Sequence, residues 1–306
     1  MLFPDFKDLI SYKKSNLGKM QLARLKVSST SPGGHHSPFR GQGLDFDAVR
    51  EYVPGDDIRN IDWRVTARTG SPHLKLFKEE KERNTILCVD VNSSMRFGTR
   101  NTFKSIQAAR SASFLGWRAL SHQDRVSACL FGDVERGIHY LDPKRTHQSV
   151  CMMLNTLAKP PLEKHRVSLQ SALQHLCRVA LPGSLIYLMS DFMDLSPSFL
   201  KDPSLIRLSK NCDVIFISIN DAADKTLVPA GILGFCKENV EKVYINTDSF
   251  KQRETYATAW KENRRLLSTI TEHFKIPLIE LSTESDIRYD LLLGLKKGAK
   301  RKKCLL

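Results

Sequence analysis

The sequence predicts an α/β protein built around a mostly parallel, doubly wound sheet. From about residue 84 onward, short apolar runs of strand length alternate with longer segments whose apolar residues recur at helical spacing. The runs Thr85–Val91, Ser184–Asp191 and Cys212–Asn220 are largely apolar on consecutive residues, which is typical of strands buried on both faces. Strands that alternate with helices favour parallel pairing through right-handed crossovers.

The remaining elements follow in chain order. Further strands are expected at Arg125–Asp133, Gly137–Leu141 and Ile276–Ser282. Helices are expected where apolar or small residues repeat every three or four positions, at Phe103–Ala119, His147–Ala158, Ser168–Val179, Ser198–Ser209 and Phe250–Phe274. The segment Ser28–Gly43 is rich in Gly, Ser and Pro, and this composition predicts an irregular loop.

Composition indicates an ordinary globular protein of the cytoplasm. The 306 residues are 41% hydrophobic, and no run approaches the roughly 20 apolar residues that span a bilayer. The first residues lack the basic and then apolar order of a secretory signal. Of the seven cysteines, four lie in or beside apolar runs, and no Cys-x-x-Cys pair suggests zinc or a redox centre. We therefore predict a cytoplasmic protein that does not span a membrane.

The net charge of +14 is unevenly distributed. The tail Lys296–Leu306 has six basic residues and no acidic one, which leaves +8 for the rest of the chain. Such a tail is either a solvated terminus or a binder of an anionic surface, a membrane or a nucleic acid. It lacks the aromatic residues that stack on bases in single-strand binding grooves, so nucleic acid is the less favoured partner.

Two predicted strands end in acids that polar loops follow. Asp90 is followed by Asn92, Ser93 and Ser94, and Asp191 closes a later strand. Ligands of open parallel sheets bind at the carboxyl ends of strands, and Mg²⁺ prefers oxygen ligands. The alternative is that Asn92 and Ser93 only cap the following helix.

An enzyme is the weaker interpretation of these acids. The chain has no Gly-x-x-x-x-Gly-Lys-Ser/Thr loop, so ATP hydrolysis would have to come from a partner. A metal-dependent nuclease or phosphatase using Asp90 and Asp191 needs further converging carboxylates, and only Asp194 is a candidate. Position 92, where a phosphoaspartate enzyme would have a second acid, is Asn. We assign no catalytic residue and no organic cofactor, and expect a non-enzymatic binding protein.

The element Asp90-Val-Asn92-Ser-Ser94 resembles the Asp-x-Ser-x-Ser motif of the metal-ion-dependent adhesion site in von Willebrand factor A domains. Asp191 is similar to the last acid of that site. The resemblance implies a von Willebrand factor A-like domain with Mg²⁺ ligands at Asp90, Asn92, Ser94 and Asp191. This sequence departs from the pattern at Asn92 and at Val167, where the adhesion site has Ser and Thr. With these departures, the resemblance implies a degenerate metal-ion-dependent adhesion site that holds Mg²⁺ weakly.

The stretch from Gly43 to Glu80 resembles the signature of the bacterial proteins called domain-of-unknown-function family 58. The matching residues are Arg50, Tyr52, Gly55, Asp56, Asp57, Arg59, Ile61, Asp62, Trp63, Ala67, Arg68, Lys75 and Glu79. Proteins of that family are often encoded beside MoxR-type AAA+ ATPases. The resemblance thus implies a protein-binding adaptor or co-chaperone for such a motor.

These patterns divide the chain into three parts: an N-terminal extension at residues 1–83 that carries the signature (43–80), a von Willebrand factor A-like domain at 84–295, and a basic tail at 296–306. The extension is expected to pack on the sheet. The signature is either a structural brace, in which Trp63 fills a gap beside the sheet, or a partner site formed by Arg59, Trp63 and Arg68. The surface predicted to bind the partner ATPase is the carboxyl edge of the sheet, at Asn92, Ser93, Ser94 and Asp191.

Overall fold

The central element is a six-stranded sheet. The computed structural model of the chain describes residues 3–15, 32–41, 45–81, 83–160, 166–235 and 243–304. Five strands are parallel, and β6 runs antiparallel to β5 at one edge. In spatial order the strands are β11 (Leu278–Ser282), β8 (Asp213–Asn220), β7 (Leu185–Ser190), β4 (Asn84–Val91), β5 (Arg125–Gly132) and β6 (Ile138–Lys144). Numbered 1 to 6 along the chain and read from the β6 edge, the strands have the doubly wound order 3-2-1-4-5-6. This order confirms the predicted fold class.

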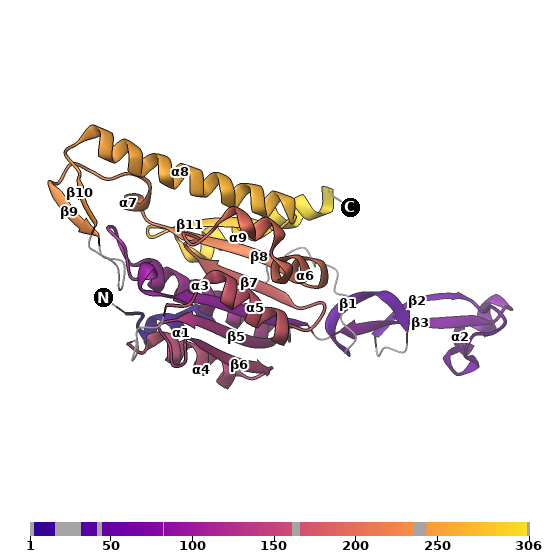
Figure 1. The fold of residues 1–306 in the computed structure, drawn as a ribbon. Coiled ribbons are helices and arrows are strands. Elements are labelled where there is room, and N and C mark those ends of the chain that lie inside the picture. Colours follow the sequence, from indigo (N-terminus) through magenta and orange to yellow (C-terminus); the bar gives the residue numbers. More distant parts are fainter. Residues whose placement is uncertain are drawn as a thin grey trace.

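Helices cover both faces of this sheet (Figure 1). One face packs against α1 (Phe6–Ser15), α3 (Lys104–Ser121), α4 (His147–Ala158) and α9 (Ile287–Cys304). The other packs against α5 (Leu169–Val179), α6 (Pro203–Asn211) and α8 (Phe250–His273). The short elements η2 (Ser93–Met95), η3 (Pro197–Lys201) and α7 (Ala222–Lys225) follow strands β4, β7 and β8.

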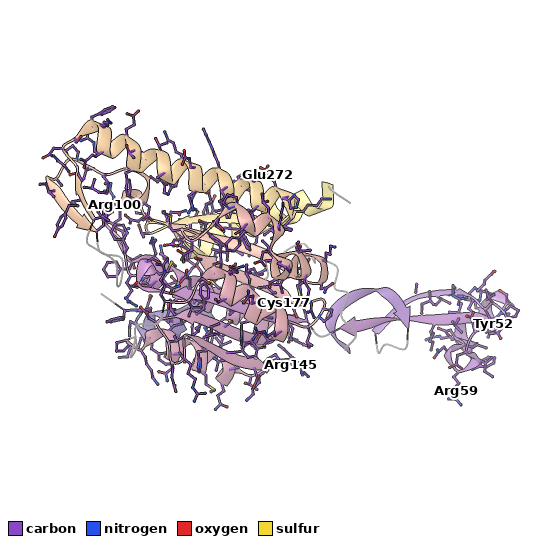
Figure 2. The ribbon with its side chains drawn as sticks, in the orientation of Figure 1. Tyr52, Arg59, Arg100, Arg145, Cys177 and Glu272 are labelled. Atoms are coloured by element: carbon purple, nitrogen blue, oxygen red, sulfur yellow. The ribbon has the colours of Figure 1, made fainter. Side chains whose placement is uncertain are left out.

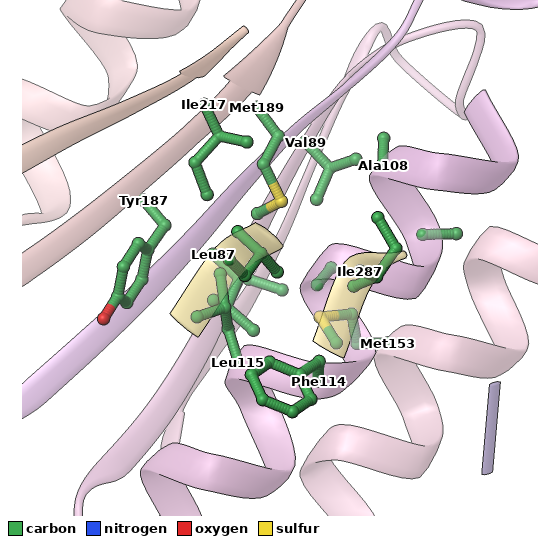
Figure 3. Close-up of a cluster of buried hydrophobic side chains, with 14 of the residues drawn as sticks. Leu87, Val89, Ala108, Phe114, Leu115, Met153, Tyr187, Met189, Ile217 and Ile287 are labelled. Atoms are coloured by element: carbon green, nitrogen blue, oxygen red, sulfur yellow. The ribbon is translucent and has the colours of Figure 1, made fainter. Parts of the chain in front are cut away.

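The strand β4 is buried on both sides. Leu87 and Val89 face the first helical layer, where Figure 3 shows Leu87 beside Leu115 of α3 and Val89 beside Met189 of β7. Ile86 and Cys88 alternate with them and join the core of the opposite face. A continuous apolar run is therefore required, because both sets of side chains leave water.

The N-terminal extension packs on this body only in part. Leu9 and Tyr12 of α1 are buried in the first core. The Ser113 hydroxyl donates to the Leu9 carbonyl at 2.6 Å, and Arg110 Nε donates to Asp8 Oδ2 at 2.8 Å. The helix α1 is thereby fixed to α3.

The signature segment does not pack on the sheet as expected. It forms an antiparallel sheet of its own, in the order β1 (Pro32–Gly41), β3 (His73–Lys81) and β2 (Asp45–Glu51), with η1 (Ile58–Asn60) and α2 (Trp63–Thr69) between β2 and β3. Figure 1 shows this unit extending away from the body. We call it the arm, and the residues Tyr52–Pro72 its tip. The strands of the arm pair with one another and bury few side chains: of those described at residues 48–76, only Leu74 is buried.

The prediction of an irregular loop at Ser28–Gly43 is also wrong for residues 32–41, and the rest of that range lies outside the described residues. Residues 32–41 pair with β3 as strand β1, although the register is interrupted between Pro32 and His35 and between His36 and Arg40. Backbone pairing with a neighbouring strand thus overrides the preference of Gly and Pro for turns.

Other elements have no counterpart in the sequence-based prediction. The strands β9 (Ile232–Phe235) and β10 (Val243–Asn246) form a separate antiparallel pair. The basic segment from Lys296 continues α9 as far as Cys304, so this part is helical and not a frayed terminus. Within the described ranges, no helix combines the length and hydrophobicity needed to cross a bilayer.

Candidate functional site

Asp90 lies at the carboxyl end of β4 with its carboxylate fully engaged. Its Oδ2 accepts a hydrogen bond from the Ser190 hydroxyl at 2.6 Å. Its Oδ1 accepts two from Asn92, one from the backbone N–H at 3.0 Å and one from Nδ2 at 2.8 Å. Because β4 and β7 are parallel neighbours, Ser190 and Asp191 meet Asp90 at the same edge of the sheet.

Asn92 connects this loop to the segment before α5. Its Nδ2 donates to the Val167 carbonyl at 3.0 Å, and its Oδ1 accepts from the Val167 N–H at 3.1 Å. The residue expected to replace the Thr ligand thus lies beside the residue that replaces the Ser ligand. Ser94 is exposed and Asn92 is buried, so the two candidate ligands have different surroundings.

Asp191 is paired with a lysine that the sequence analysis did not consider. Lys104 Nζ lies 3.0 Å from Asp191 Oδ2 and 3.3 Å from Asp224 Oδ2. All three residues are buried. Asp224 belongs to α7, so the lysine connects the start of α3 to the loops that follow β7 and β8. The sequence signal that could have revealed it is a basic residue in the first helical turn, where it opposes the helix dipole.

Arg264 completes the surroundings of Asp191. From α8 its Nη2 donates to the Asp191 carbonyl at 2.5 Å, and its Nη1 donates to the Ser218 hydroxyl at 2.5 Å. Its guanidinium lies 5.6 Å from the ring centroid of Trp260. The backbone and the side chain of Asp191 are thus each held by a different cationic residue.

The electrostatics of the edge follow from burial and from these pairs. Burial and then the nearby carboxylate of Asp191 raise the pKa of Asp90 to about 7, although Ser190 and Asn92 oppose the shift with their hydrogen bonds. Burial alone would lower the pKa of Lys104, but the carboxylates of Asp191 and Asp224 outweigh it and raise that pKa. The ammonium is therefore charged at neutral pH.

The donor set does not fit a divalent cation. Asp191 Oδ2 faces the Lys104 ammonium, and the side-chain oxygen Oδ1 of Asn92 accepts the Val167 backbone N–H. The Asp90 carboxylate accepts three hydrogen bonds. Among the described residues, no three or more His, Cys, Asp or Glu side chains are grouped to hold a metal ion. Of the four predicted ligands, only Ser94 presents an exposed side chain.

Most of the signature residues lie in the tip, and Arg50, Lys75 and Glu79 lie in the adjoining strands β2 and β3. Three acids of the tip each have a structural role. Asp56 pairs with Arg50 at 2.6 Å and accepts from the Val53 N–H, and these hydrogen bonds lower the pKa of Asp56. Asp57 accepts from the Arg59 N–H as the N-cap of η1. Asp62 caps α2 by accepting from the N–H groups of its first turn.

The basic and apolar side chains of the tip point outward. Trp63 has 71% of its surface exposed, Ile58 64% and Val53 56%. Arg59, Arg64 and Arg68 are exposed as well. Figure 2 shows Tyr52 and Arg59 at the end of the arm remote from the body. All three residues Arg59, Trp63 and Arg68 are thus exposed on the tip, and the arm separates them from the Asp90 loop.

The fold and the site define the class of protein. It is an α/β protein with a mostly parallel, doubly wound sheet, and Asp90 and Asp191 are buried at the carboxyl edge of this sheet. The model of the family described as "Protein of unknown function DUF58" matches residues 48–266, and the chain belongs to this family.

Similar proteins extend the comparison. An uncharacterized protein of Mycobacterium tuberculosis is 27% identical over 273 residues, which is 88% of this chain and 84% of the relative. The crystal structure of conserved hypothetical protein BatB from Bacteroides thetaiotaomicron aligns with a TM-score of 0.43 at 13% identity, over 72% of this chain and 99% of BatB. A von Willebrand factor type A structure from Catenulispora acidiphila aligns with a TM-score of 0.39 at 11% identity, over 74% of this chain and 44% of the other. None of these names specifies an enzymatic activity.

Proposed function

We propose that the protein is a non-enzymatic adaptor that binds a protein partner with the tip of its arm. The observation that carries this proposal is the exposure of Trp63, Arg59, Arg64 and Arg68 on one unit that extends from the body. Tryptophan and arginine are enriched among the residues that dominate binding energies. Large apolar side chains gathered on a soluble surface are typical of interaction sites.

The charge arrangement of the tip supports a partner with an acidic and partly apolar surface. The acids Asp56, Asp57 and Asp62 are engaged in an ion pair or in helix caps, whereas the arginines extend outward. Of the side chains that the structure describes, none forms an ion pair with Arg59, Arg64 or Arg68. Their guanidinium groups can therefore form bidentate hydrogen bonds with partner carboxylates.

The carboxyl edge is the weaker partner surface. Asp90, Asn92 and Asp191 are buried and already hydrogen-bonded, which leaves Ser93 and Ser94 as accessible polar groups of the loop. The same contacts weigh against a metal-dependent nuclease or phosphatase that uses Asp90 and Asp191. An anionic surface bound by the basic end of α9 is a further alternative, which a steep decrease of affinity with salt would reveal.

For the partner, the resemblance to domain-of-unknown-function family 58 favours a MoxR-type AAA+ ATPase. The test is binding of the purified chain to the MoxR-type ATPase of the same organism, with and without chelator. We expect Trp63→Ala to weaken binding by at least about tenfold, since truncating a central residue costs more than about 1.4 kcal/mol. Arg59→Ala and Arg68→Ala should each weaken it less.

The matched control is Tyr289→Ala, which truncates an aromatic side chain that is 66% exposed on α9. If Tyr289→Ala binds with wild-type affinity and Trp63→Ala binds more weakly, the tip of the arm is supported as the binding site. Equal affinity of both variants and the wild type would refute the tip as the binding site. Turnover of a phosphate ester or nucleic acid that Asp90→Asn abolishes would favour the enzyme instead.

A further inference from the structure

Lys104 occupies a position that is unfavourable for a cation. It is the first residue of α3, where unpaired N–H groups make the end of the helix partly positive, and its N-cap residue Phe103 forms no capping hydrogen bond through its side chain. The residue is only 2% exposed. Burial of an ammonium at this end of a helix requires compensation by negative charge.

Two carboxylates from different loops provide that compensation. The Nζ of Lys104 lies 3.0 Å from Asp191 Oδ2 and 3.3 Å from Asp224 Oδ2. Both carboxylates are also engaged in their own loops, because Asp191 Oδ1 accepts from the Met193 N–H and Asp224 Oδ2 accepts from the Asp221 N–H as well. The lysine therefore fixes the loops that follow β7 and β8 to the start of α3.

This is the role that a divalent cation has at a metal-ion-dependent adhesion site, where the ion joins the loops at the carboxyl edge. Here the last acid of the motif, Asp191, contacts an ammonium that belongs to the chain. The other predicted ligands are engaged in hydrogen bonds or, in the case of Ser94, exposed. The disagreement between motif and donor set thus has a specific structural cause.

We propose that the Lys104 ammonium is a built-in substitute for the divalent ion, which makes the carboxyl edge of this protein independent of metal. The proposal does not depend on the arm or on its partner. It predicts that removal of the ammonium exposes a latent cation site between Asp191 and Asp224. A divalent ion binds carboxylate oxygens at about 2.0–2.6 Å, so the two carboxylates would have to approach the former Nζ position by roughly 1 Å.

The experiment is thermal unfolding of wild type and Lys104→Ala in chelator and then in Mn²⁺ at matched ionic strength. The melting temperature of the wild type should be the same in both. Lys104→Ala should melt roughly 10 °C lower in chelator, because two buried carboxylates lose their cation. Millimolar Mn²⁺ should then restore several degrees in this variant, in a dose-dependent manner.

Two controls identify the ligands. Lys210→Ala removes an exposed lysine of α6 and should respond to Mn²⁺ as the wild type does. Lys104→Ala/Asp191→Asn removes one freed carboxylate and should lose the response to Mn²⁺. If Lys104→Ala does not fold in chelator, refolding in millimolar Mn²⁺ replaces the melting experiment: the variant should fold with Mn²⁺ and stay unfolded with chelator.

Three results would overturn the proposal. The first is a melting temperature of the wild type that falls in chelator and recovers with Mn²⁺. The second is saturable, submillimolar binding of Mn²⁺ to the wild type in calorimetry, which requires no variant. The third is a Lys104→Ala protein that is folded but indifferent to Mn²⁺, or one that stays unfolded in both chelator and Mn²⁺.

Discussion

The charge of Asp90 is strongly affected by folding. Burial and the nearby Asp191 raise its pKa from 3.8 to about 7. Between about pH 4 and pH 7 the folded state therefore binds more protons at this residue than the unfolded state does. The contribution of Asp90 to the free energy of unfolding is thus most favourable below this range, and it decreases as the pH rises through it.

Asp90→Asn should remove this decrease from the pH dependence of the free energy of unfolding. The amide cannot ionise, so the stability of the variant relative to wild type should increase by about 1–3 kcal/mol between pH 5 and pH 8. Urea unfolding at several pH values measures this difference. Asp90→Ala should be destabilised across the whole range, because the donors of Ser190 and Asn92 lose their acceptor. Parallel profiles of wild type and Asp90→Asn would contradict a raised pKa.

The two tryptophans Trp63 and Trp117 have opposite environments. From the sequence, Trp63 was expected to fill a gap beside the sheet, so its truncation should have destabilised the fold by several kcal/mol. Its 71% exposure leads to the opposite expectation, a change within about 0.5 kcal/mol. Trp117→Ala, at 4% exposure in the first core, should cost about 3–5 kcal/mol. Chemical denaturation of both variants tests the contrast, and a large loss in Trp63→Ala would restore the brace interpretation.

At the scale of elements, the sequence predicts the body well and the arm poorly. The buried strands β4, β7 and β8 are apolar on consecutive residues, and the helices between them repeat with helical spacing, so local pattern and tertiary packing agree. Strand β1 is different, because its partner β3 is distant in sequence and β1 is rich in Gly and Pro. The strands β9 and β10 pair with each other, but each has only four residues and most of them are exposed, so neither forms a buried apolar run.

The candidate site was predictable only in its position. Alternating strands and helices place Asp90 and Asp191 at one edge, since parallel neighbours end together. Whether Asp191 is free to bind a cation depends on Lys104, which pairs with Asp191 and Asp224. Lys104 and Asp224 come from α3 and α7 and share no local motif with Asp90. A pairing between residues so distant in sequence cannot be inferred from spacing.

The loop after β4 also depends on the end of β5. Gly132 has φ of 122°, and a Cβ atom there would lie 2.5 Å from the Asn92 backbone nitrogen. Gly132→Ala should therefore displace the Asn92 loop and destabilise the protein by about 1–3 kcal/mol. Thermal unfolding measures the loss, and Gly231→Ala is the control. Gly231 also has positive φ, but its Cβ would meet no atom within 4 Å. Equal effects of the two variants would show that backbone strain alone, and not contact with Asn92, is responsible.

At the scale of the whole molecule, the body and the arm differ in what stabilises them. The body has two buried clusters, one on each face of its sheet. Of the described arm side chains, only Leu74 is buried, and backbone pairing with contacts such as Arg50–Asp56 holds the strands together. An exposed ion pair contributes little, and small sheets without a buried face are marginally stable. Capture of a partner by Trp63 would supply the apolar contact that the arm lacks.

This difference predicts two classes of backbone amide in hydrogen exchange. Amides of β4, β7 and β8 should exchange only through global unfolding, because both faces of these strands are buried. Amides of β2 and β3 at residues 48–51 and 73–76 should exchange at least about tenfold faster through local opening of the arm. Exchange followed by mass spectrometry resolves the two classes. Addition of the proposed partner, a MoxR-type ATPase, should slow exchange in the arm of the wild type but not in Trp63→Ala, while exchange in β4 stays the same in both. Arm amides as protected as those of β4 in the free protein would contradict the independence of the arm.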